Sequence, residues 1–213
     1  MCFFNSLSVN ASALEKRFNA GFKEKEKFNP VSKGNAFGGI SWPVITGEET
    51  QVINFQEWGL IPSWVKDVET AKKIRFQTLN ARSETVFEKP SFRNSIKTRR
   101  CLIPSTGFYE WQHEGKKKIP WFIGIKDTDI FSMAGIWDEW VNLDTGEIFR
   151  GFSILTTKAN SIMEKIHNTK KRMPVILLPE YERDWLKSDI DEKKVQDLCT
   201  SVEDKWVNAT ILS

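Results

Sequence analysis

Two hairpin patterns in the middle of the chain constrain the fold more than any other feature of the sequence. In the first, strand-like residues 107–111 and 119–125 flank the turn signal Glu114-Gly115. In the second, residues 130–137 and 148–155 flank Asp144-Thr145-Gly146. Further strand-like segments are residues 51–55, 101–103, 175–178 and 206–212. A sheet built largely from antiparallel neighbours is therefore expected.

Short helices are expected between and after these strands. Ser12-Ala13-Leu14-Glu15 has the spacing of a capping box, and Gly21 is a stop signal, which predicts a helix over residues 12–20. Pro179 opens a helix that reaches Leu186. Other helical segments are residues 71–75, 158–166 and 191–198. Because no repeat or linker interrupts residues 1–213, we expect one α+β domain, with a mixed or antiparallel sheet curled into a barrel-like core and flanked by helices.

The charge pattern is informative locally rather than overall. The chain has 31 basic and 28 acidic residues, and a net charge of +3 does not by itself indicate a nucleic-acid partner. Any one basic cluster is ordinarily a solvated turn, but three of them flank the motifs described below, which makes a basic groove more plausible. The three clusters are Lys97-Thr98-Arg99-Arg100, Lys116-Lys117-Lys118 and Lys170-Lys171-Arg172. The nine tryptophans could fill a core or line a groove that stacks bases.

The cysteines argue against a disulfide framework or a zinc site. Cys2, Cys101 and Cys199 are odd in number and irregularly spaced, and no paired Cys/His spacing occurs. We expect no metal and no organic cofactor. The sequence shows neither a signal-peptide pattern nor an apolar run near the ~20 residues that span a bilayer. A soluble, cytoplasmic protein with reduced thiols and no membrane partner is expected.

Cys2 carries the most reactive combination of groups. Removal of Met1, which is expected before a small residue, would leave a thiol and a free α-amine on adjacent carbons of Cys2. Such an α-amine has a pKa of roughly 7.7–8.0. It can form a Schiff base with an aldehyde, and the thiol can then close a five-membered thiazolidine. On position alone, a small residue near a chain end is the simpler interpretation.

Two further residues could exchange protons with a substrate. His167 follows a helical segment, where a helix-capping histidine is an equally good interpretation. Glu110 lies in the strand-like segment 107–111, on the face opposite Tyr109 and Trp111. An exposed strand carboxylate is the simpler interpretation, but a buried one would be partly protonated and could act as an acid or base.

Two motifs could contact a nucleic acid. Asn80-Ala81-Arg82-Ser83-Glu84-Thr85 combines an amide suited to a sugar oxygen with a guanidinium suited to a phosphate, although it could also be an Asn-capped helix start. Trp58 and Trp64 bound an apolar loop, Trp58-Gly59-Leu60-Ile61-Pro62-Ser63-Trp64. One indole could anchor the core, and one could stack against bases.

Taken in order, these motifs resemble the SOS response-associated peptidase (SRAP) family, whose members recognise abasic sites. The resemblance rests on Met1-Cys2, the loop of residues 58–64, the segment 80–85, Arg100-Cys101-Leu102-Ile103-Pro104 with Gly107-Phe108-Tyr109-Glu110-Trp111, and His167 with Arg172-Met173-Pro174-Val175-Ile176-Leu177. It implies an SRAP-like fold and a monomer that captures abasic sites in single-stranded DNA. It also implies a thiazolidine crosslink through Cys2 that protects the lesion in the SOS response, with the protein at the nucleoid when it is engaged on DNA.

The resemblance also implies roles for individual residues. Asn80 would hold Cys2 or the sugar, Glu110 would orient or protonate the amine, and His167 would assist ring opening. The implied DNA-binding residues, which include a phosphate ligand, a wedging indole and a loop proline, are Arg82, Trp64, Pro43, Trp58 and Arg172.

Two departures from the family pattern stand out. Many members have Gly-Arg after the cysteine, where this chain has Phe3-Phe4. Many members also place Arg-Met-Pro two residues after the histidine, whereas residues 168–171 intervene here between His167 and Arg172. This longer segment could shift His167.

Two other functions compete with abasic-site capture. A cysteine peptidase would use Cys2 as nucleophile and His167 as base, although the resemblance supports peptidase activity mainly as self-removal of the residue before Cys2. A non-covalent binder of single-stranded DNA would use Trp64 and the basic clusters, and would leave no covalent product.

Overall fold

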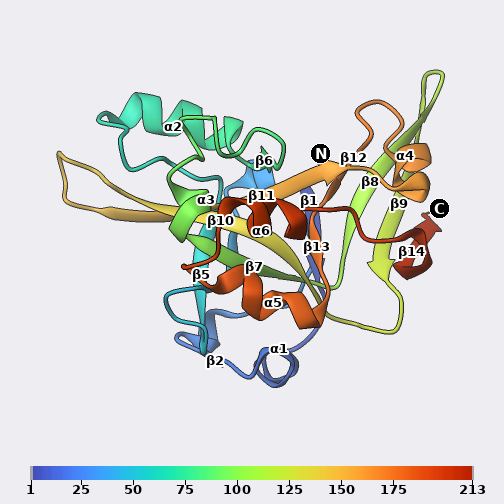
Figure 1. The fold of residues 1–213 in the computed structure, drawn as a ribbon, viewed down its shortest axis with the longest axis horizontal. Coiled ribbons are helices and arrows are strands. Elements are labelled where there is room, and N and C mark those ends of the chain that lie inside the picture. The colour runs from blue at the N-terminus through green and yellow to red at the C-terminus, as the bar shows by residue number, and fades with distance from the viewer. Residues whose placement is uncertain (1, 213) are drawn as a thin grey trace.

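A closed barrel forms the centre of the computed structural model, which describes residues 2–212. The predicted removal of Met1 concerns a residue outside that range. The barrel strands are β4 (Ser41–Thr46), β5 (Val52–Trp58), β7 (Arg100–Ser105), β10 (Phe131–Val141) and β11 (Ile148–Lys158). They pair in the order β11-β10-β7-β4-β5, and β5 returns in parallel to β11, which closes the ring (Figure 1). The predicted α+β class with a barrel-like core is confirmed.

A second sheet continues from the barrel. Its order is β14 (Val207–Ile211), β9 (Lys117–Ile125), β8 (Gly107–Glu114), β1 (Phe4–Leu7) and β3 (Val31–Asn35). Only Thr106 separates β7 from β8, so the chain passes directly from the barrel into this sheet. Both predicted hairpins are present, since β8 pairs with β9 up to Glu114–Lys117 and β10 pairs with β11 up to Val141–Ile148.

Three very short strands organise the end of β11. The strand β6 (Asn80–Arg82) pairs with β11 in parallel, and β12 (Arg172–Pro174) pairs with it antiparallel. Thr156 of β11 is the partner of both Arg82 and Pro174, so the two flanking strands lie on opposite sides of one residue. The alternative of a helix start at Asn80 is therefore wrong. The other short strands are β2 (Gly21–Phe22), which pairs with β5, and β13 (Ile176–Leu177), which pairs with β10.

Short helices cover the strands. They are α1 (Ala11–Phe18), α2 (Val68–Gln77), α3 (Ser95–Thr98), α4 (Ser161–Ile166), α5 (Pro179–Leu186) and α6 (Glu192–Leu198). The helix α1 is capped by Asn10, whose side chain accepts a hydrogen bond from the Ala13 amide, so the capping box predicted at Ser12 is wrong. Asn also ranks among the best N-cap residues, and it precedes Ser12 by two positions. Within residues 2–212, no helix has both the length and the apolar character needed to cross a membrane.

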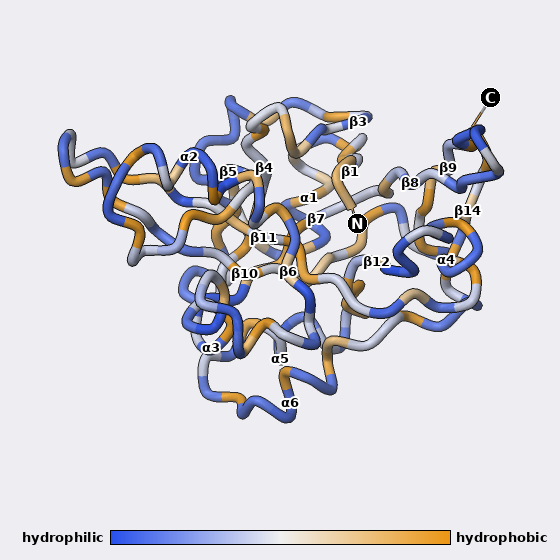
Figure 2. Tube along the Cα trace, turned by 90° about the horizontal axis from the view of Figure 1, so that it is seen from above, coloured by the Kyte–Doolittle hydropathy of each residue, from blue (hydrophilic) through white to orange (hydrophobic). Residues whose placement is uncertain are grey.

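The three most deeply buried tryptophans belong to the core. Trp42, Trp58 and Trp185 have almost no exposed surface. The indole N–H groups of these three residues donate to backbone carbonyls, at 2.9 Å to Pro104, 2.9 Å to Leu79 and 3.0 Å to Cys101 respectively, which satisfies the polar end of each ring. Apolar segments accordingly concentrate in the strands of the barrel, and hydrophilic ones in the outer loops (Figure 2).

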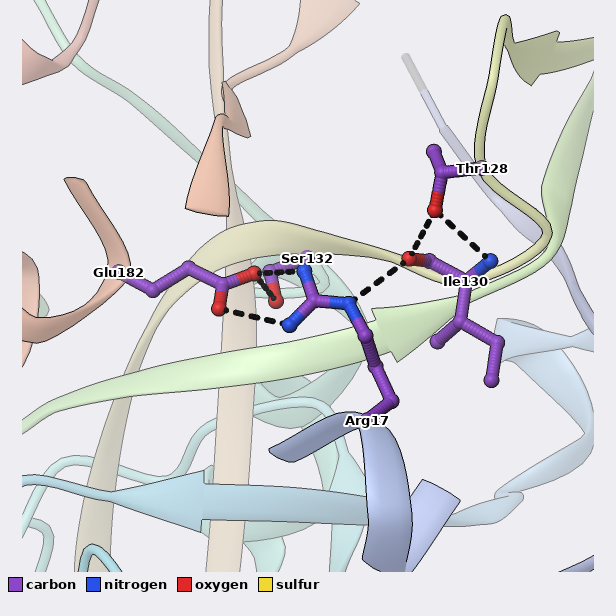
Figure 3. A network of polar contacts seen from close by, with 5 residues as sticks. All are labelled: Arg17, Thr128, Ile130, Ser132 and Glu182. Atoms are coloured by element: carbon purple, nitrogen blue, oxygen red, sulfur yellow. Dashed lines mark hydrogen bonds and ion pairs between the residues drawn. The ribbon is translucent and has the colours of Figure 1, made fainter. Parts of the chain in front are cut away.

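A partly buried ion pair holds two helices against the barrel (Figure 3). Arg17 of α1 donates to both carboxylate oxygens of Glu182 of α5, at 3.0 and 2.6 Å, and its Nε donates to the Ile130 carbonyl. Ser132 of β10 donates to the same carboxylate at 2.7 Å. Because Glu182 is paired and hydrogen-bonded, its burial is compensated, and the cluster fixes α1 and α5 on β10.

Candidate functional site

Cys2 lies two residues before the start of β1 and has no exposed surface. Asn80, at the start of β6, donates from Nδ2 to the Cys2 carbonyl oxygen at 2.9 Å. The Asn80 Oδ1 atom is buried and makes no hydrogen bond to any residue in the described range 2–212. Asn80 therefore holds the backbone at Cys2 and keeps an acceptor oxygen beside it.

Glu110 and His167 form a buried acid–base pair. Glu110 lies in β8, His167 follows the last residue of α4, and each side chain is only 7% exposed. His167 Nδ1 lies 2.8 Å from the Arg172 carbonyl oxygen, and His167 Nε2 lies 4.0 Å from Glu110 Oε2. The contact to the carbonyl orients the ring so that Nε2 faces the carboxylate.

The surroundings shift the protonation of all three groups. Burial raises the pKa of Glu110 to about 7. Burial also lowers the pKa of His167, so the neutral imidazole is favoured near pH 7. Burial raises the pKa of the Cys2 thiol well above its ordinary value, and the negative charge of Glu110 raises it further. The site therefore holds a protonated thiol beside a carboxyl group that can both give and accept a proton.

Hydrogen bonds of Ser105, which the sequence analysis did not predict, join the strands that carry the site. Ser105 Oγ donates to Asn5 Oδ1 at 2.6 Å and accepts from the Gly107 amide at 3.0 Å. Asn5 lies in β1 after Cys2, and Gly107 begins the strand that contains Glu110. The sequence pattern that could have indicated this contact is the polar Asn5-Ser6 pair within the apolar first residues of the chain.

Two of the predicted DNA-binding residues are accessible. Arg82 is exposed at the end of β6, two residues from Asn80. Trp64 is 48% exposed, and its indole N–H donates to the Pro90 carbonyl at 3.1 Å, which leaves ring surface available for stacking.

Three other predicted DNA-binding residues are buried in this structure. Pro43 is buried in β4, and Trp58 is fully buried against Phe152. Arg172 is 7% exposed and donates to both carboxylate oxygens of Glu84, at 2.5 and 2.8 Å. These side chains have little exposed surface, and Arg172 holds the segment after His167 through its pairing with Glu84.

The Phe3-Phe4 departure is accommodated by packing. The ring of Phe3 lies 4.9 Å from that of Phe37, and the ring of Phe4 lies 5.1 Å from that of Trp111. The Lys33 ammonium lies 5.3 Å from the Phe4 ring centre and 5.2 Å from that of Trp111. Both aromatic residues therefore stabilise the start of β1 through ring contacts and a cation–π interaction.

The longer segment after His167 does not separate this residue from Glu110. The Lys171 amide donates to the His167 carbonyl at 2.8 Å, which closes residues 168–171 into a turn.

Within residues 2–212, no group of three or more His, Cys, Asp or Glu side chains is arranged to hold a metal ion.

Comparison with known proteins identifies one family. The sequence model of "SOS response associated peptidase (SRAP)" matches residues 1–213. Abasic site processing protein YoqW of Bacillus subtilis (strain 168) is 46% identical over 130 residues, which cover 61% of this chain and 54% of the relative. Abasic site processing protein HMCES of Gallus gallus is 35% identical over 146 residues, which cover 60% of this chain and 42% of the relative. The chain thus spans about half the length of the curated relatives it matches.

A solved structure is similar over the whole chain. The crystal structure of a protein from Bacteroides thetaiotaomicron is 42% identical and superposes with a TM-score of 0.96, covering 100% of this chain and 92% of the other. A phage-related protein from Bordetella bronchiseptica, 19% identical with a TM-score of 0.69, shares the fold.

Proposed function

This chain belongs to the SOS response associated peptidase (SRAP) family, and on that basis we propose that it processes abasic sites in single-stranded DNA. We further propose that it does so by a covalent thiazolidine bond through Cys2. The observation that carries the proposal is the convergence of Asn80 on the Cys2 carbonyl, at 2.9 Å, with the Glu110–His167 pair beside the Cys2 thiol. Each of the four residues comes from a different part of the sequence.

The proposed reaction requires Cys2 to be the first residue of the mature protein. Hydrolysis of the Met1–Cys2 peptide bond consumes one water and frees the amine. An abasic sugar in its ring-opened form carries an aldehyde, and the Cys2 nitrogen adds to that carbon. The resulting carbinolamine loses its hydroxyl as water and becomes an iminium ion, and Cys2 Sγ then adds to the same carbon. The crosslinking step releases one water and needs no oxidant or reductant.

The side chains supply the protons for these steps. Protonated Glu110 gives its proton to the departing hydroxyl, and the carboxylate then takes the thiol proton when sulfur adds. A pKa of about 7 suits both directions of transfer. His167, kept neutral by burial, can accept the proton of the sugar hydroxyl when the ring opens. Asn80 fixes the Cys2 backbone, so the nucleophile is positioned before the sugar binds.

A cysteine peptidase mechanism is less consistent with this environment. Such an enzyme depends on a lowered thiol pKa, usually through an imidazolium partner. Here burial and the Glu110 charge raise the pKa of the Cys2 thiol, and the His167 Nδ1 atom contacts the Arg172 carbonyl.

The proposal is tested with three single-stranded oligonucleotides of one sequence. One carries an abasic aldehyde, one carries the tetrahydrofuran analogue that has no aldehyde, and one carries a normal base. The protein, shown by intact mass to lack Met1, should form an adduct that survives denaturing electrophoresis with the first oligonucleotide alone. Equal adduct with the tetrahydrofuran analogue, or none with the aldehyde, would overturn the proposal.

Glu110→Gln is expected to slow adduct formation by about 10²–10⁴-fold, the range typical of general acid–base catalysis. It should also change the pH profile. The fraction of neutral amine rises toward its pKa of roughly 7.7–8.0, whereas the protonated fraction of Glu110 falls above pH 7. The wild-type rate should therefore peak near neutral pH, and the variant should lose the decline on the alkaline side. Single-turnover rates across the pH range measure both effects.

The matched control is Glu147→Gln, which changes an exposed carboxylate in the turn of the β10–β11 hairpin. It should leave the rate and the profile unaltered. A Glu110→Gln profile that still declines on the alkaline side would show that another group gives the decline.

A further inference from the structure

Asn168 joins two lysine-rich segments that are far apart in the sequence. Its Nδ2 donates to the His113 carbonyl at 2.8 Å, and the His113 amide donates to Asn168 Oδ1 at 3.1 Å. Within residues 2–212, β1 pairs with β8 at Phe108 and Gly107 alone, so His113 lies on a stretch of β8 beyond β1. Asn168 therefore satisfies backbone groups on this edge of the hairpin and fixes the 168–171 turn against it. Figure 1 shows the α4–β12 loop beside the tip of the β8–β9 hairpin.

This contact links the hairpin tip to the candidate site. The turn starts at His167, which faces Glu110. Two backbone hydrogen bonds hold its end: the Lys171 amide donates to the His167 carbonyl at 2.8 Å, and the Ala159 amide donates to the Lys171 carbonyl at 3.1 Å. The turn thus connects the buried site histidine to the exposed hairpin tip.

The hairpin tip and the turn carry uncompensated positive charge. Their exposed lysines without an ion pair in the described part of the chain are Lys116, Lys117, Lys118 and Lys170. Lys171 is paired with Glu164 at 2.6 Å, and Glu114 is the acidic residue in the hairpin tip itself. Clustered like charges repel one another, and a polyanion bound along them would remove that repulsion.

We propose that the β8–β9 tip and the 168–171 turn form a second phosphate-binding surface, which holds the DNA backbone flanking the lesion on the His167 side. The inference rests on the proposed function, because continuity with His167 is what favours a DNA strand over another polyanion. It assigns a role to the segment by which this chain departs from the family spacing: Asn168 fixes the lysines at one distance from the site. Lysine ammonium groups would contact phosphates without reading sequence.

The test measures non-covalent binding of a single strand that carries the tetrahydrofuran analogue, over a range of salt concentrations. Because this probe has no aldehyde, its result does not depend on Cys2 chemistry, so failure of the inference and failure of the proposed function are distinguishable. The variant replaces the hairpin lysines with Gln, as K116Q, K117Q and K118Q together. The charge-matched control replaces exposed lysines in α1, directly after β2 and in α6, as K16Q, K23Q and K193Q together.

The hairpin variant should bind roughly tenfold more weakly near physiological salt. The slope of log affinity against log salt should fall by roughly 2, since each lost phosphate contact on a single strand contributes about 0.7. The control variant should match the wild type. Equal losses in the two variants would show a general effect of net charge and would overturn the inference.

Trimming the strand adds a geometric test. Removal of the nucleotides on one side of the analogue, the contacted flank, should make the wild type and the hairpin variant bind equally. Removal of the nucleotides on the other side should leave the difference in affinity between the two proteins unchanged. Asn168→Ala, which keeps every lysine, should weaken binding only to strands that keep the contacted flank. A hairpin-variant loss that is the same for both trimmed strands would contradict a surface on one side of the site.

Discussion

Cys2→Ala is expected to abolish the adduct that survives denaturing electrophoresis, although its unfolding transition should stay close to that of the wild type. The alanine variant keeps an α-amine and can still form a Schiff base, but it has no sulfur to close the ring. Cys2→Ser isolates the same step, because its oxygen ring opens far more readily than a thiazolidine. Both variants should give a stable adduct only after the Schiff base is trapped by reduction. The measurement is adduct yield with and without a reductant.

Cys199→Ala is the control for loss of a thiol as such. Cys199 is a buried free cysteine after α6, and burial raises its pKa to about 12, so it is not a reactive thiolate near neutral pH. Its removal should leave the adduct yield unchanged. A Cys2→Ala variant that forms unreduced adduct at the wild-type yield would show that sulfur at position 2 is not required.

Arg100→Met is expected to lower the free energy of unfolding by about 3–5 kcal/mol, the largest stability effect we predict. The Arg100 side chain is 1% exposed. It donates to backbone carbonyls at or next to the ends of α3 and α5, namely those of Ile96 at 2.6 Å, Lys97 at 2.7 Å, Trp185 at 2.8 Å and Lys187. Methionine retains an unbranched apolar side chain but leaves these buried acceptors without donors.

Thermal and denaturant unfolding measure this effect. For a chain of this size each kcal/mol shifts Tm by roughly 2–4 °C, so a decrease of about 10 °C is expected. Arg93→Met, at an exposed position that has no ion pair within residues 2–212, should change stability by less than about 0.5 kcal/mol. A loss of under about 1 kcal/mol for Arg100→Met would mean that water or a rearranged backbone replaces the guanidinium.

Local patterns predicted the elements whose partners are close in sequence. The β8–β9 and β10–β11 hairpins were identified from alternation and turn residues, because each strand pairs with the next one along the chain. Pro179 marked the first residue of α5. The strands β6 and β12, with three residues each, carry no periodicity and depend on pairing with β11. The relative placement of Asn80 and His167 follows from that pairing and could not be deduced from either segment alone.

The role of an arginine in a basic cluster could not be predicted from the sequence. Lys97-Thr98-Arg99-Arg100 suggested a basic groove, yet Arg100 is buried and Arg99 is paired with the buried Asp138. Arg172 likewise pairs with Glu84, a residue 88 positions away, and no local rule indicates that partner. A guanidinium can serve a helix end, a carboxylate or a phosphate equally well, so only the fold distinguishes these roles.

Intact mass spectrometry of the purified adduct, followed by peptide mapping, tests the central claim most directly. We predict the mass of the protein without Met1 plus the oligonucleotide minus one water, with the modification on the peptide that begins at Cys2. An adduct that retains Met1, or one that maps to a lysine, would contradict the account.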